Sequence, residues 1–165
     1  SSPLRIADLL TVVLFSILSL FLFSCNSDEP KLETPFRVKI IDSDYSLAYS
    51  MIYELDMDTI RVSFSGELEG EVDSIVYRRQ LSIEEKGKIA AFFSEFPLAA
   101  LENEYINPNV DDGDQKLFEI VIGKLNKRVQ TSNFYEAHLG NLVNFLNALI
   151  DDKYKIRYKA SKQTG

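Results

Sequence analysis

Potential metal ligands are most concentrated between residues 107 and 114, which read Asn-Pro-Asn-Val-Asp-Asp-Gly-Asp. Oxygen ligands close to a glycine suit Ca²⁺. The side chains that could supply them are those of Asn107, Asn109, Asp111, Asp112 and Asp114. The spacing of an EF-hand loop is absent, because counting from Asn107 places Gly113 at position seven instead of six and Phe118 at position twelve. We therefore favour a solvated turn, with a calcium site or a partner-binding loop as the alternatives.

His138 is the only histidine. A catalytic or metal-binding role would need partners, and no second histidine and no cysteine follow Cys25 in the sequence. The residue types of a Ser-His-Asp triad are present, but a G-x-S-x-G nucleophile elbow is not. Glu84 and Glu85 are adjacent carboxylates, yet they follow Ser82 as a helix capping box would. We therefore expect a surface histidine, no bound cofactor and no catalytic centre.

Six segments of the chain have the alternating or apolar-rich patterns that are typical of strands, and a seventh suggests a short additional strand. They span residues 36–40, 47–55, 60–65, 72–81, 117–122, 128–132 and, as a short last strand, 154–158. In the fourth of these segments, the spacing predicts that Ile75 and Tyr77 share one face. The fifth and sixth are expected to form a hairpin around the loop 123–126.

Two segments have the spacing of amphipathic helices. The first is expected to begin at the cap Ser82 and to end near Phe96, just before a proline. The second contains apolar residues at intervals of three and four between residues 139 and 150, with Ser132 or Asn133 as its expected cap. Residues 99–105 are expected to add a short helical turn.

Strands that occur in groups, rather than alternating with helices, favour the α+β class. The predicted fold is a mostly antiparallel sheet of about six strands with two amphipathic helices packed on one face. The opposite face must then be wet in part, or be used for binding.

The apolar run from Leu9 to Phe23 is about 15 residues long, which is short for a membrane-spanning helix of roughly 20 residues and suits a signal peptide. Arg5 precedes this run, and the sequence Leu-Phe-Ser-Cys ends at Cys25, the only cysteine. These four residues resemble the lipobox of bacterial lipoproteins. The resemblance implies cleavage before Cys25, acylation of Cys25 and a stable anchor in a membrane, because several acyl chains bind far more tightly than one. A signal anchor that is never cut and a secreted form cut near Ser24 are the alternatives.

The acidic pair Asp28 and Glu29 resembles the export signal of Bacteroidetes-type surface lipoproteins, which implies the cell envelope and the periplasmic or surface face of its outer membrane. The expected organisation is a signal peptide over residues 1–24, the lipidated cysteine and a flexible tether over 25–34, one α+β domain over 35–160 and a disordered tail over 161–165. The segment from Asp111 through Tyr158 resembles small lipoprotein domains without an assigned function, and this likeness implies no functional residues.

The composition disfavours some classes of partner. Removing residues 1–24 removes one basic and one acidic residue, so the mature chain keeps the net charge of −7. Such a chain is poorly suited to nonspecific binding of nucleic acid or of anionic lipid. We therefore expect a non-catalytic binding or accessory module that contacts the membrane through acylated Cys25 and binds an envelope protein or a glycan. An envelope hydrolase acting on glycans or peptides and an inhibitor of a partner enzyme remain the alternatives.

Overall fold

Alternation of apolar and polar side chains along each strand builds a sheet with one dry face. The computed structural model describes residues 34–43, 49–66, 73–110 and 113–159. Within them the strands are β1 (Phe36–Ser43), β2 (Tyr49–Leu55), β3 (Thr59–Gly66), β4 (Ser74–Gln80), β5 (Glu104–Ile106), β6 (Gln115–Ile122) and β7 (Leu125–Ser132). The helices are α2 (Ile83–Glu95) and α3 (Ala137–Asn147), with 3₁₀ turns at Leu98–Ala100 and Asp152–Tyr154.

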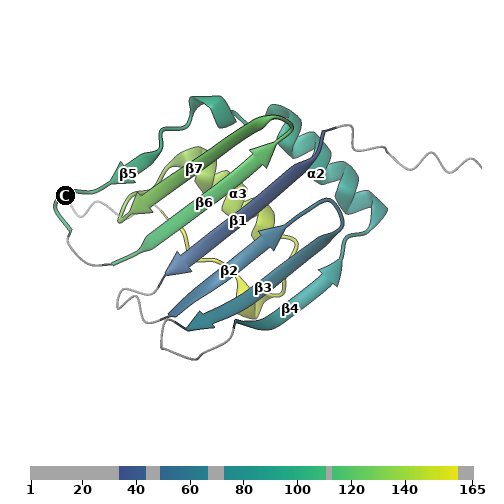
Figure 1. Cartoon of the computed structure of the whole chain (residues 1–165), viewed down its shortest axis with the longest axis horizontal. Coiled ribbons are helices and arrows are strands. Elements are labelled where there is room, and N and C mark those ends of the chain that lie inside the picture. The colour runs from purple at the N-terminus through teal and green to yellow at the C-terminus, as the bar shows by residue number, and fades with distance from the viewer. Residues whose placement is uncertain (1–33, 44–48, 67–72, 111–112, 160–165) are drawn as a thin grey trace, which may run out of the picture. The chain divides into compact units, whose positions relative to one another are not determined.

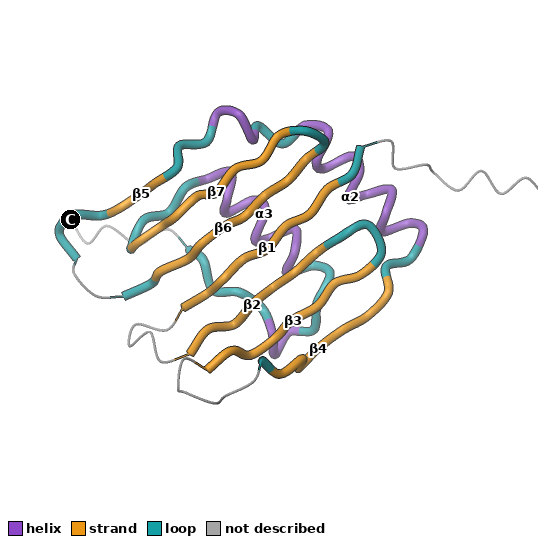
Figure 2. Tube along the Cα trace, in the orientation of Figure 1, coloured by secondary structure: helices purple, strands orange, loops and turns teal. Residues whose placement is uncertain are grey.

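The seven strands form one sheet in the order β4-β3-β2-β1-β6-β7-β5. All neighbours pair antiparallel except β5, which runs parallel to β7 at one edge. Both helices lie on the same side of the sheet, behind it in the view of Figures 1 and 2. The α+β prediction is therefore confirmed, with one more strand than expected.

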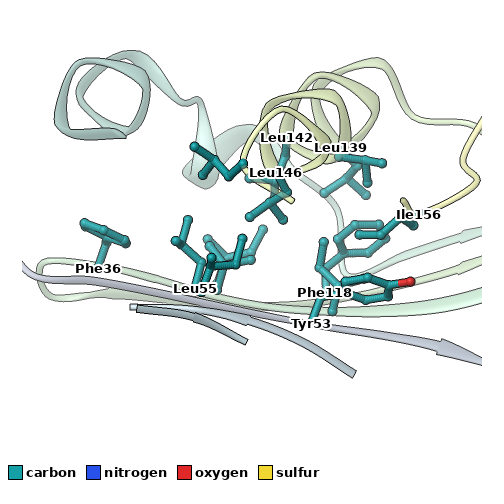
Figure 3. Close-up of a cluster of buried hydrophobic side chains, with 14 of the residues drawn as sticks. Phe36, Tyr53, Leu55, Phe118, Leu139, Leu142, Leu146 and Ile156 are labelled. Atoms are coloured by element: carbon teal, nitrogen blue, oxygen red, sulfur yellow. The ribbon is translucent and has the colours of Figure 1, made fainter. Parts of the chain in front are cut away.

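Side chains from both helices fill the space above the dry face of the sheet. Figure 3 shows Leu139, Leu142 and Leu146 of α3 directed toward Leu55 and Phe118 of the sheet. All five side chains are at most 2% exposed. The larger core also contains aromatic stacks, including Phe36 on Phe93 and Phe92 on Phe145. The apolar spacing in the sequence thus predicted the buried side of α3 correctly.

The short strand β5 replaces the end of the helical turn that was expected over 99–105. Only Leu98–Ala100 is helical, in 3₁₀ form. The backbone N–H of Gln130 in β7 donates to the carbonyl of Asn103 at 2.8 Å, and the ring of Tyr105 stacks on Phe134 at 5.6 Å. These partners lie about 25 to 30 residues further along the chain, so the local sequence does not reveal them.

The hairpin between β6 and β7 turns more tightly than predicted. Ile122 pairs directly with Leu125, which leaves only Gly123 and Lys124 in the turn instead of residues 123–126. Gly123 has φ of 60°, and glycine at the first central position is the requirement of a type II′ hairpin turn. Its N–H also donates to the carbonyl of Pro35 at 2.7 Å.

A β-bulge in the edge strand β4 corrects the expectation that Ile75 and Tyr77 share a face. Tyr77 lies opposite Val62, whereas Ile75 lies opposite Ser63, so one residue of β4 is extra. The carbonyl of Val76 at the bulge accepts a hydrogen bond from the hydroxyl of Tyr154 at 2.8 Å. Tyr77 therefore faces the helices, and Ile75 faces the other side.

Helix α3 begins later than predicted, with Glu136 as its N-cap instead of Ser132 or Asn133. Asn133 adopts φ of 51°, and its Oδ1 accepts a hydrogen bond from the Asp114 N–H at 3.0 Å, so it closes a loop rather than capping a helix. The carboxylate of Glu136 takes the capping role instead and accepts a hydrogen bond from the N–H of Leu139 at 2.7 Å.

The last predicted strand, over 154–158, is not a strand. Its alternation is real, since Ile156 and Tyr158 are 4% and 6% exposed. However, the backbone of Ile156 pairs with a side chain: its N–H donates to Asn147 Oδ1 at 2.8 Å, and its carbonyl accepts from Asn147 Nδ2 at 2.9 Å. The amide of Asn147 thus supplies the donor and the acceptor that a neighbouring strand would have supplied.

Candidate functional site: the open face of the sheet

In the described part of the 107–114 loop, the side chains of Asn107 and Asp114 are already paired with neighbouring groups of the protein. Asn107 Oδ1 accepts a hydrogen bond from the Asn109 N–H at 3.1 Å, and the Asp114 carboxylate pairs with the ammonium of Lys116. Asp111 and Asp112 lie outside the described residues. Within the described residues, no three His, Cys, Asp or Glu side chains are grouped so as to hold a metal ion.

Lys116, which the sequence analysis did not single out, is the most buried charged side chain among those that form ion pairs in the described residues, at 1% exposed. Its ammonium lies 2.7 Å from Asp42 Oδ1 and 5.9 Å from the ring centroid of Tyr158. Burial raises the pKa of Asp42, and the neighbouring ammonium offsets only part of that effect. Through its two ion pairs, Lys116 links Asp114 to Asp42 at the end of β1. The sequence could have indicated the burial of Lys116, because residues two apart in a strand share a face and Lys116 lies two residues before Phe118.

His138 contacts the helix cap. Its Nδ1 lies 2.8 Å from Glu136 Oε1, and the imidazole side chain is 52% exposed. Burial alone would raise the pKa of Glu136, but hydrogen bonds from Leu139 and His138 outweigh it and hold that pKa below its usual value. This pairing places the histidine at the surface of α3, where the sequence analysis expected it.

Glu84 and Glu85 serve different partners. Glu85 accepts from the Ser82 N–H at 2.8 Å and from both terminal nitrogens of Arg79, so the capping box is confirmed and joined to a salt bridge. Glu84 pairs with Lys88 at the surface, at 2.6 Å. The two carboxylates therefore do not face each other across a cleft.

The side of the sheet opposite the helices, here called the open face, is crossed by no described helix or loop (Figure 1). Cross-strand pairing orders its side chains in rows. The aliphatic row consists of Ile75, Ile52, Ile41 and Leu117, with Ser63 between the first two. The charge row consists of Arg78, Arg61, Glu54, Lys39, Glu119 and Arg128. Beyond the aliphatic row lie Ser65, Ser50, Ser43, Gln115 and Ser132.

The open face is more basic than the chain as a whole. Its described strands carry five basic residues, Arg37, Lys39, Arg61, Arg78 and Arg128, and three acidic ones, Glu54, Glu104 and Glu119. The whole chain, by contrast, has a net charge of −7. Positive charge is therefore gathered on the one face of the sheet that the helices leave uncovered.

Two hollows lie at the end of the open face where β1 begins. A small cavity of about 120 Å³ is lined by Arg37, Glu54, Leu55, Asp56, Thr59, Arg61 and Arg78. An adjoining open groove of about 720 Å³ shares four of these residues and adds the apolar side chains of Pro35, Met57 and Val121. Sequence reasoning missed this site because its arginines are about 20 residues apart and meet only through the strand order.

Comparison with known proteins adds no further assignment: the chain matches no family model and no curated protein. Cys25 lies outside the described residues. Among the residues that the structure describes, no helix has the length and apolar character needed to cross a membrane.

Proposed function

We propose that this chain is a lipoprotein of the bacterial cell envelope, anchored in the outer membrane through acylated Cys25, and that its α+β domain binds another envelope protein without catalysing a reaction. The binding surface in this proposal is the open face of the sheet. The observation that carries the proposal is the aliphatic row, to which four strands contribute a residue, on a face that no described helix or loop covers.

An aliphatic row on that face departs from the usual pattern of an antiparallel sheet. Such sheets commonly pack one face on the core and present polar residues on the other. Here Ile41, Ile52 and Leu117 are half-buried by their neighbours, and Ile75 is 54% exposed. Apolar surface flanked by polar and charged rows is the arrangement found at protein interfaces, where a dry centre is surrounded by a polar rim.

The lipid anchor is tested by intact mass and fractionation. The protein purified from membranes is expected to begin at Cys25 and to carry added acyl chains, and Cys25→Ser should leave the membrane fraction. An unmodified mass that retains residues 1–24, or a Cys25→Ser variant that stays with the membrane, would refute the anchor.

Binding through the open face is tested by site-specific photo-crosslinking in cells, with two matched isoleucines. Ile75 on the open face and Ile83 at the start of α2 are 54% and 51% exposed, so a photoreactive residue is equally accessible at either position. We expect the probe at position 75 to capture an envelope protein and the probe at position 83 to capture none. Equal capture at both positions, or none at 75, would refute the proposed surface.

A further inference from the structure

The small cavity on the open face is built from arginines of three different strands. Arg37 belongs to β1, Arg61 to β3 and Arg78 to β4, and all three side chains line the same space of about 120 Å³. Because the guanidinium group is a planar fork that matches a carboxylate in two places, arginine is the residue best suited to bind that group.

The cavity contains one positive charge more than its own acidic residues neutralise. Glu54 accepts from Arg61 Nε at 2.8 Å and forms its salt bridge. Asp56 acts on Arg37 electrostatically, although its Oδ1 already accepts the N–H groups of Asp58 and Thr59. The Arg78 guanidinium has no hydrogen-bond or ion-pair partner among the described residues, so it is the charge left over.

The pairing of β3 with β4 makes the unneutralised positive charge unfavourable for the stability of the sheet. Arg61 and Arg78 are direct cross-strand partners, and like charges directly opposite each other destabilise a sheet. The next residue, Arg79, is fully paired by contrast. Its guanidinium donates to Glu85 and to the carbonyl of Leu149, both on the helix side of the sheet. A departure from sheet rules that folding does not need is expected at sites with a function.

We infer that this cavity binds a side-chain carboxylate from an acidic peptide segment of the partner protein, an inference that rests on the proposed function and specifies the partner's chemistry. One surplus positive charge matches one carboxylate. The adjoining groove, at about 720 Å³, has room for neighbouring side chains of such a segment. Its apolar residues Pro35, Met57 and Val121 suit an aliphatic side chain, and methionine adapts readily to peptide partners.

The test uses the full chain in a neutral detergent and a fluorescent probe peptide, acetyl-Leu-Glu-Val-Glu-Leu. The control peptide carries glutamine in place of both glutamates. By fluorescence anisotropy, the acidic peptide should bind at least tenfold more tightly than the control, and rising salt should reduce the difference. Equal binding of the two peptides would overturn the inference. Tighter binding of an oligogalacturonate probe would also overturn it, because the carboxylate would then belong to a glycan.

Two matched substitutions locate the site. R78Q should weaken binding of the acidic peptide at least tenfold, and R128Q, which removes the same charge from the other end of the charge row, should change it less than twofold. Because Arg78 is exposed, R78Q should melt within about 2 °C of the wild type. Equal losses in both variants would indicate nonspecific attraction and overturn the inference.

The crosslinking test separates the two proposals. If R78Q still permits capture at position 75 while the two peptides bind equally, the arginine site is wrong and the open-face binding function stands. If position 75 captures no protein in the wild type, the proposed function itself is wrong.

Discussion

Neutralising Glu85 should destabilise the domain far more than neutralising its neighbour Glu84. The Glu85 carboxylate accepts from Arg79 Nη1 and Nη2 at 2.8 and 2.7 Å, and from the Ser82 N–H at 2.8 Å. Arg79 in turn donates to the carbonyl of Leu149, so one pair of side chains links β4, the start of α2 and the turn after α3. Glutamine at position 85 keeps the shape but offers only one acceptor oxygen.

The expected cost follows from the pKa and the burial of the pair. The hydrogen bond from Arg79, above all, lowers the pKa of Glu85 from 4.5 to about 2, which corresponds to about 3 kcal/mol before solvent screening is considered. The two side chains are 31% and 24% exposed, so solvent screening reduces this to about 2 kcal/mol. For a domain of this size, the melting temperature should fall by roughly 5–10 °C.

E84Q is the matched control. It removes the same charge from the same turn of α2, but Glu84 pairs only with Lys88, and these side chains are 75% and 65% exposed. An exposed pair four residues apart on a helix contributes little to stability, because solvent screens its charges. Urea unfolding followed by circular dichroism measures both variants, since the chain has no tryptophan for fluorescence.

The pH dependence gives a second check. Because the pKa of Glu85 is lower in the folded state than in the unfolded state, its stabilisation is present above about pH 4.5 and disappears as the pH falls toward 2. Wild type and E85Q should therefore converge in stability under acid conditions. The reasoning is refuted if E85Q costs no more than E84Q at pH 7, or if its cost is unchanged at pH 3.

Three further predictions concern substitutions in the two helices. Gly140→Ala should destabilise the domain by more than about 2 kcal/mol in urea unfolding, because a Cβ would lie 2.1 Å from the hydroxyl oxygen of Tyr135. Gly87→Ala should stabilise α2 by about 0.5–1 kcal/mol, because the new Cβ would meet no atom within 4 Å beyond its chain neighbours and the backbone of its own helix. A change of the same sign in the free energy of unfolding for both glycine variants would contradict this reasoning. Asn147→Ala should cost about 1–2 kcal/mol and speed hydrogen exchange at the Ile156 amide, which loses its acceptor; unchanged exchange would show that the side-chain pairing does not hold this segment.

Elements governed by local rules were predictable. Helix α2 follows from Ser82 and Glu85, because a capping box is contained within four residues. Helix α3 follows from apolar spacing, which requires no knowledge of the partner surface. The expected class also followed, since the order of strands and helices along the chain limits the possible layers.

Errors arose wherever the local pattern did not identify the partner of a backbone or side-chain group. The alternation around Ile156 predicted its burial but not that Asn147 would replace a strand, because alternation reports which side is dry and not what lies beside the backbone. Glu136, and not Asn133, caps α3, because the Asn133 side chain accepts a hydrogen bond from the backbone N–H of Asp114. The hairpin turn was shorter than predicted, since pairing of Leu125 with Ile122 depends on strand register.

The sequence by itself determined the capping box of α2, the apolar stripe of α3 and the α+β class, because each follows from local patterns and their order along the chain. Only the tertiary structure decided which polar residues meet. Strand order places β1 between β2 and β6, and this aligns Ile52, Ile41 and Leu117 in one row. The same order brings Arg37 and Arg78, which are 41 positions apart in the sequence, to one cavity. Register is a non-local property, and the candidate binding face exists only once it is set.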